Sequence, residues 1–135
     1  MIYEKYNIIM GSVLKAFNSH LEEFIRDVSL VFPNDLDIRV AKTTISTLIK
    51  LNPSKLIKVW KKHICKYSEE ISSGNIEYFL NKDYSEDIGG MEDADNISNV
   101  INKLRNPVRE MGGENQAKAI KYIQNLNKLC LVYFN

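Results

Sequence analysis

Apolar side chains recur along the chain at intervals of three and four residues, which is the spacing of one face of an α-helix. The clearest run is Phe17, Leu21, Phe24, Val28 and Val31. It predicts a helix over about residues 12–32, which ends there because Pro33 disfavours helical geometry at the residue before it. We expect a second helix to follow at once, capped by Asn34 or Asp35, and to reach about Leu51.

Four further helices are expected after the second. Their ranges are about 53–72, 76–80, 94–110 and 114–133. Pro53 suits the first position of a helix, because the N–H that proline lacks is unpaired there in any case. Pro107 lies inside the third of these segments, so that helix either kinks at the proline or ends at Arg105. No stretch alternates as a β-strand does, and the sequence therefore predicts an all-α fold, a compact bundle of five to six helices.

Length and charge refine this expectation. The chain has 135 residues, which suits a single domain over 1–135. Its net charge of +1 creates no overall field that would draw it to nucleic acid or membranes. The charge is uneven, however: residues 50–66 carry six lysines and no acid, whereas residues 69–95 carry nine acids and only Lys82. The polar, acidic segment from about 81 to 95 predicts a long exposed loop.

The lysines are the strongest positive signal for binding. Four of them, spaced by three, four and four residues, would form one basic stripe on a helix, flanked by Lys50: Lys55, Lys58, Lys62 and Lys66. Such a stripe could follow a phosphate backbone, although the block lacks arginine, the usual residue for paired phosphate contacts. Two other interpretations stay open: a contact with a partner protein, and a solvated helix face paired with the acidic loop.

The last expected helix carries apolar side chains around much of its circumference, which is typical of a central or an interface helix. One stripe holds Ala119, Ile123, Leu126 and Cys130. A second stripe includes Tyr122, Leu129 and Tyr133, and we predict that these three residues contribute to an interface with a partner.

Two groups of acidic residues have the residue types of a metal site. His20, Glu23 and Asp27 share one helix face, but neighbouring apolar residues occupy the inward face, so we expect the trio to point sideways or into solvent. Asp35 and Asp37 resemble the start of a calcium loop, yet its glycine and its final glutamate are missing, and helix capping explains both aspartates. No metal ion or other cofactor is therefore expected.

The sequence contains no spacing typical of a catalytic motif: no G-x-S-x-G, no HExxH and no phosphate-binding loop. Cys65 and Cys130 fit no zinc motif and lie in apolar stretches, so we expect small buried hydrophobic residues. A disulfide between them is geometrically possible, but a reducing compartment does not favour it. We therefore expect that the protein is not an enzyme, although an active site assembled from distant residues stays open.

Membrane insertion and secretion are not expected. No run approaches 18 apolar residues. The N-terminal segment lacks both the basic region and the long apolar region of a signal peptide.

Four stretches resemble a family of small helical proteins encoded by nucleocytoplasmic large DNA viruses of algae and protists. They are FNSHLEEFIRDVSLVFPNDLDIRVAKTTI, NPSKLIKVWKKHI, YFLNKDYSED and KYIQNLNKL, in this order along most of the chain. The resemblance rests on spaced aromatic, proline and acidic positions and includes no catalytic motif, so no site residues carry over. It implies a viral protein in the virion or in the cytoplasm of the host cell.

Together these features lead us to expect a non-enzymatic viral protein that acts through contacts with other proteins, viral ones or further copies of itself. A minor component associated with the virion or its capsid would fit this description. The alternative is a nucleic-acid-associated or gene-expression factor that uses the lysine stripe.

Overall fold

The computed structural model describes residues 2–81 and 94–135, and all regular structure in these two ranges is helical. In chain order the elements are α1 (Ile2–Val31), α2 (Leu36–Leu51), α3 (Lys55–His63), the 3₁₀-helix η1 (Cys65–Tyr67), α4 (Ser68–Ser72), α5 (Ile76–Asn81), α7 (Ala94–Glu110) and α8 (Gly113–Tyr133). This confirms the predicted all-α fold, although the described residues contain seven α-helices where five to six were expected. None of the helices in these ranges is long and apolar enough to span a membrane. The predicted acidic loop falls mostly on residues 82–93, outside the described residues.

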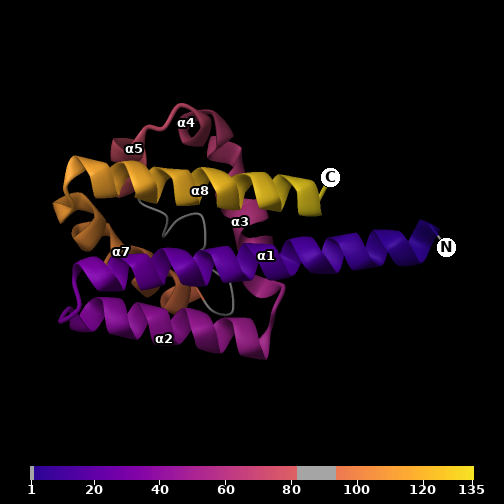
Figure 1. Cartoon of the computed structure of the whole chain (residues 1–135), viewed down its shortest axis with the longest axis horizontal. Coiled ribbons are helices and arrows are strands. Elements are labelled where there is room, and N and C mark those ends of the chain that lie inside the picture. Colours follow the sequence, from indigo (N-terminus) through magenta and orange to yellow (C-terminus); the bar gives the residue numbers. More distant parts are fainter. Residues whose placement is uncertain (1, 82–93) are drawn as a thin grey trace.

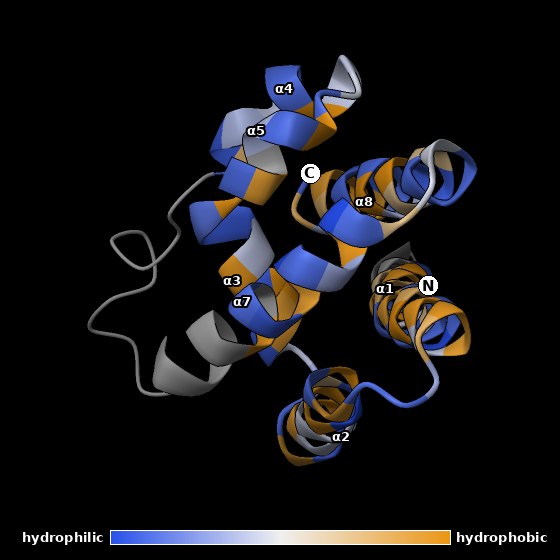
Figure 2. Cartoon of the chain, turned by 90° about the vertical axis from the view of Figure 1, so that its left-hand side faces the viewer, coloured by the Kyte–Doolittle hydropathy of each residue, from blue (hydrophilic) through white to orange (hydrophobic). Residues whose placement is uncertain are grey.

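Three long helices form one layer of the bundle (Figure 1). In this layer α1 lies between α2 and α8 and runs antiparallel to both. Figure 2 shows these three helices nearly end-on, with α3 and α7 against one side of the layer. The short helix α4 packs on α8, and α5 packs on α7. This arrangement places α1 at the centre of the fold.

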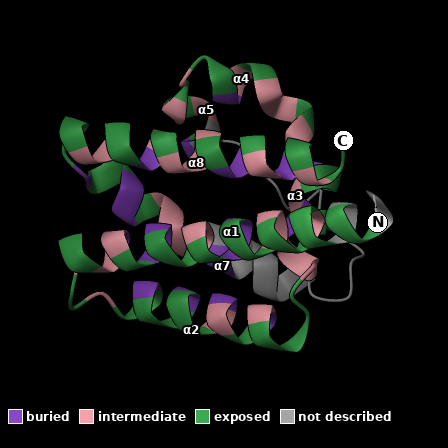
Figure 3. Ribbon diagram, turned by 45° about the vertical axis from the view of Figure 1, so that its right-hand side comes forward, coloured by how far each residue is buried: buried purple, intermediate pink, exposed green. Residues whose placement is uncertain are grey.

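The core consists of three clusters of buried side chains, and α1 contributes to each of them. Phe24 and Val28 pack with Ile38 and Ala119, Phe17 packs with Ile57, Leu126 and Cys130, and Ile25 packs with Ala41, Ile45 and Val100. Figure 3 shows buried positions of α2 and α8 on the sides that face α1. The stripe predicted on the first helix is therefore the main source of the core.

The corner between α1 and α2 forms as the sequence predicts. The first helix ends at Val31, two residues before Pro33. Asp35 caps the second helix, because its Oδ1 accepts hydrogen bonds from the backbone N–H groups of Asp37 at 2.9 Å and Ile38 at 3.2 Å. Lys103 of α7 forms an ion pair with Asp37 at 2.9 Å between Nζ and Oδ1, which ties a third helix to this corner.

The prediction of one continuous helix over 53–72 is wrong. The structure divides it into α3, η1 and α4, with a break at Ile64. Beyond the break the chain turns so that Ile71, only 1% exposed, is buried and α4 packs on α8. Gln124 of α8 donates a 3.1 Å hydrogen bond to the carbonyl of Ile71 and so helps to hold α4 in place. Tertiary contacts have therefore overridden the local helical pattern.

The helix predicted to kink or end near Pro107 does not end at Arg105. The structure continues α7 through a buried Pro107 to Glu110. Arg109, in its last turn, donates a 2.7 Å hydrogen bond to the carbonyl of Leu80 and links this helix to the end of α5.

Candidate functional site

The lysine stripe is shorter in the structure than the sequence predicts. Lys58 and Lys62 are exposed on α3, and Lys55 at the start of the same helix is half-buried. Lys66 lies beyond the break, in η1, where its Nζ is 5.4 Å from the centre of the Tyr67 ring. Lys50 is exposed in the last turn of α2. The structure thus brings three of the five predicted lysines onto one continuous helix.

The three residues predicted as a partner interface on α8 are each half-buried and already contact the rest of the chain. Leu129 and Tyr133 pack against the cluster around Phe17. Tyr122 stacks on Phe24 with ring centroids 5.2 Å apart, and its hydroxyl donates a hydrogen bond to the carboxylate of Asp27. Their contribution to a partner interface stays a prediction.

The polar trio of α1 lies sideways, against α8, with only part of it in solvent. The His20 ring packs against the Tyr122 ring at a centroid distance of 4.7 Å, and His20 Nδ1 lies 3.7 Å from Glu23 Oε2. Asp27 accepts the hydrogen bond from Tyr122 described above. No group of three or more histidine, cysteine or acidic side chains suited to a metal ion occurs among the described residues.

The hydrogen bond between Tyr122 and Asp27 predicts a pH dependence. This bond, with partial burial and the nearby Asp27 and Glu23 charges, raises the pKa of Tyr122 to about 12. An unfolded tyrosine has a pKa of about 10, so the bond contributes its full stability below pH 10 and loses it as the pH rises through 12. We expect the difference in unfolding free energy between the wild type and Tyr122→Phe to shrink across this window. Urea unfolding of both proteins below, within and above it is the measurement, and a constant difference would contradict the role of the bond.

Exposed apolar side chains occur near both ends of the chain. Ile8 and Ile9, in the first turns of α1, are 68% and 55% exposed. Leu131, Val132 and Phe134, at the end of α8, are also exposed. Figure 1 shows that α1 extends past the end of α8 at this side of the molecule. We call these five residues the terminal apolar surface.

The sequence analysis does not include Ile8 and Ile9 in a helix, because the predicted first helix begins only at about residue 12. The helix begins at Ile2. The apolar run from Ile8 to Met10 was a visible signal, but it lies outside the stripe that marks the buried face. A smaller exposed apolar group lies at the other end of α1 and on α2, and consists of Leu30, Val31, Leu36 and Val40.

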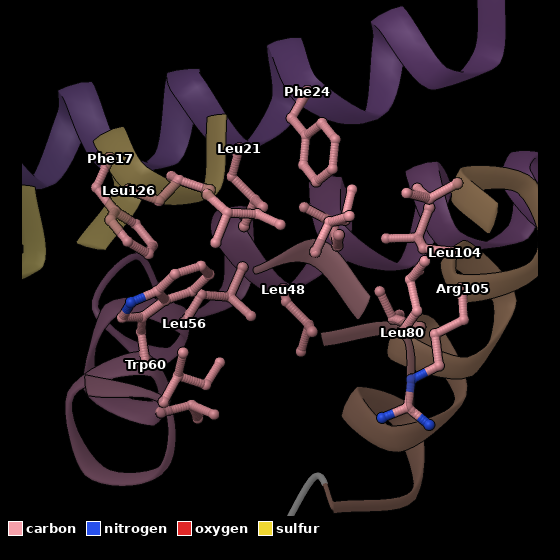
Figure 4. A pocket seen from close by; sticks show the side chains of 17 residues that line it. Phe17, Leu21, Phe24, Leu48, Leu56, Trp60, Leu80, Leu104, Arg105 and Leu126 are labelled. Carbon is pink, nitrogen blue, oxygen red and sulfur yellow. The ribbon is translucent and has the colours of Figure 1, made fainter. Parts of the chain in front are cut away.

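An apolar cavity of about 180 Å³ lies inside the bundle (Figure 4). Side chains of α1, α2, α3, α5, α7 and α8 line it, among them Phe17, Leu48 and Trp60. Arg105 is the only charged residue of the 17 that line it, and Figure 4 shows its guanidinium away from Phe17 and Phe24. A cavity of about 150 Å³ with a comparable lining can bind benzene, so this one can hold a small apolar group. The described residues of its lining include no nucleophile or general base.

One polar cluster is built into the core, around Asn127 of α8, which is only 4% exposed. Its Oδ1 accepts hydrogen bonds from the Trp60 indole Nε1 at 3.0 Å and from the Cys65 thiol at 3.4 Å. Its Nδ2 donates to Ser68 Oγ at 3.2 Å. The amide thus satisfies polar groups of α3, η1 and α4 together, and it fixes the position of all three on α8.

Comparison with known proteins finds no match for this chain. No family model, no curated protein and no solved structure matches the chain.

Proposed function

We propose that the protein is a non-enzymatic viral helical protein that acts through contacts with other proteins, in the virion or in the host-cell cytoplasm. The viral context comes from the four stretches of sequence described above. The observation that carries the binding role is the terminal apolar surface. Exposed apolar groups that cluster at one place on a protein mark contact sites more often than scattered ones do.

The chemistry of this surface favours a protein partner. Ile8 and Ile9 are adjacent on a helix that extends past the bundle, so a second helix could pack against them. Glu4, Lys5 and Lys15 of the same helix are exposed as well, and they supply the polar rim that surrounds a typical protein interface.

The test is co-purification of the tagged protein from infected cells, with mass spectrometry of its partners and of purified particles. The double variant Ile8→Asp, Ile9→Asp is expected to lose the partner proteins that the wild type retains, because each change places a charge inside the interface. The matched control Leu30→Asp alters a residue of the same helix that is 71% exposed at the opposite end, and it should retain them. Identical partner sets for the two variants would contradict the assignment of this surface. Light scattering on the same proteins decides whether one partner is a second copy of the chain.

The alternative function, binding of nucleic acid, is favoured by Lys58 and Lys62, which are exposed one helical turn apart with Lys55 beside them. If these three lysines contact phosphates of a DNA duplex, changing them to glutamate should reduce the slope of log Kobs against log salt concentration by about 2.7. A matched control changes Lys118, Lys121 and Lys128, three exposed lysines of α8, in the same way. The affinities of the wild type and of both triple variants for DNA are measured over a salt series, and only the α3 variant should show the reduced slope. A wild type without salt-dependent affinity would eliminate this alternative.

A further inference from the structure

Two thiols that are distant in sequence meet inside the fold. Cys65 lies in η1 and Cys130 lies in α8, and their sulfur atoms are 3.6 Å apart. The break after α3 creates this contact, because η1 lies against α8 instead of continuing the axis of α3. Both cysteines are free thiols.

The two thiols have different surroundings. Cys130 is fully buried, with 0% of its surface exposed, whereas Cys65 is only half-buried. The hydrogen bond between the thiols lowers the pKa of Cys65, and the charge of Lys61 lowers it further, while partial burial acts in the opposite direction. The same hydrogen bond and burial raise the pKa of Cys130. The surroundings therefore favour the thiolate form of the less buried thiol, Cys65.

Hydrogen bonds hold both sulfur atoms in place. The Cys65 thiol donates to Asn127 Oδ1 at 3.4 Å, and the Cys130 thiol donates to the carbonyl of Ile57 at 3.5 Å. A disulfide bond is about 2.0 Å long, so the sulfurs must approach by about 1.6 Å to form one. The pair is thus close to bonding distance without being bonded.

We propose that Cys65 and Cys130 form a reversible oxidation site in which a hydroperoxide oxidises Cys65 and Cys130 then closes an intramolecular disulfide. In the first step the Cys65 thiolate attacks one peroxide oxygen, the O–O bond breaks, and the departing hydroxide takes up the proton that the Cys65 thiol released on ionisation, which gives the first water. Cys65 becomes a sulfenic acid. In the second step the sulfur of Cys130 attacks the sulfur of Cys65, the S–O bond breaks, and the departing hydroxide takes the proton of Cys130. Two thiols and one hydrogen peroxide give one disulfide and two waters, and a dithiol reductant reverses the change.

This cross-link would change the stability of the molecule. It would join η1 to α8 across 65 positions of sequence, and closure of a loop of this length removes much of the entropy of the unfolded chain. We expect the Tm of the oxidised protein to exceed that of the reduced protein by about 10 °C. Leu131 and Val132 directly follow Cys130, so the cross-link would also restrain part of the terminal apolar surface.

The experiment treats the reduced, full-length protein with one equivalent of hydrogen peroxide under native conditions. The expected product is a monomer whose intact mass is lower by two hydrogen atoms and which has no free thiol left. No mass increase from added oxygen is expected. Digestion should yield one peptide pair joined through Cys65 and Cys130, and dithiothreitol should restore the original mass and Tm. An unreactive protein, a dimer linked between chains, or oxygen added to Cys65 without the disulfide would each overturn the proposal.

Variants separate the roles of the two thiols. Cys130→Ala should stop at the sulfenic acid of Cys65, which dimedone captures, whereas Cys65→Ala should leave Cys130 reduced at the same peroxide concentration. Equal reactivity of Cys130 in the Cys65→Ala protein would overturn the assignment of Cys65 as the first site of attack. Circular dichroism checks that each variant is folded, and Cys130→Ser provides a second variant because a hydroxyl can also donate to the carbonyl of Ile57. The wild-type result stands by itself if both substitutions of Cys130 prevent folding.

Discussion

Replacement of Phe17 by alanine should lower the free energy of unfolding by about 4 kcal/mol, because it removes a fully buried aromatic ring. The ring packs with Ile57 and Leu126 and meets the Trp60 ring edge-on, with centroids 5.7 Å apart. Proteins of this size are stable by only about 5–15 kcal/mol, so the loss is a large share of the total. Urea unfolding followed by circular dichroism measures it.

The control for this change is Phe134→Ala, since Phe134 is 38% exposed at the end of α8. It removes the same atoms from a position outside the buried clusters and should cost less than about 1 kcal/mol. Equal losses at the two positions would mean that the cluster around Phe17 does not stabilise the fold as described.

Replacement of Asn127 by alanine should cost about 3 kcal/mol, which is more than the loss of one ordinary hydrogen bond. The change leaves the Trp60 indole N–H and the Cys65 thiol without the acceptor that Asn127 supplies inside the fold. A buried polar group without its partner costs about 1–3 kcal/mol, and two groups are affected here. Thermal and urea unfolding measure the effect, and the fluorescence of Trp60, the single tryptophan, reports the local change.

Asn125→Ala is the matched control for this second prediction. Asn125 is exposed on the same helix, so both variants gain the same helix propensity and only one loses the buried contacts. The control should be neutral or slightly more stable than the wild type. A similar loss in both variants would show that the polar cluster contributes nothing beyond the helix itself.

The sequence predicts those parts of the fold that depend on local chemistry. The stripe that includes Phe17, Phe24 and Val28 marks the buried face of α1, because a helix that packs on one side must repeat its apolar residues at helical spacing. The stop near Pro33 and the cap at Asp35 follow from the chemistry of single residues and are confirmed at atomic detail. These features depend only on residues that are close in sequence, so they can be predicted without knowing the rest of the fold.

The break within 53–72 could not be predicted in this way. The local pattern favoured one helix with Leu56, Trp60 and Ile64 facing inward, whereas the structure fully buries Ile57 and leaves those three half-buried. Contacts with α8, more than fifty residues away in sequence, determine where this segment turns. The spacing of apolar residues shows which side chains tend to be buried, but it does not show which distant part of the chain they pack against.

The meeting of Cys65 with Cys130 depends on the same turn and was therefore not visible in the sequence. Each cysteine fits the prediction of a small residue in an apolar stretch, and only their distance suggests a chemical role. Asn127 did give a signal, since it is a polar residue within the apolar stretch of the last helix. A polar side chain at such a position requires partners inside the protein.

The length of α1 has a consequence for the energetics of binding. The helix has 30 residues, or about 45 Å, but no described side chain before Phe17 is fully buried. Among the described residues of its first half, Leu14 packs against the cluster around Phe17, and the others are exposed or half-buried. Isolated helices of this length are only marginally stable in water, so we expect this half to open locally more readily than the core. Part of the binding free energy of a partner at this half would then be used to order the segment, which lowers the affinity and favours contacts that are selective and readily released.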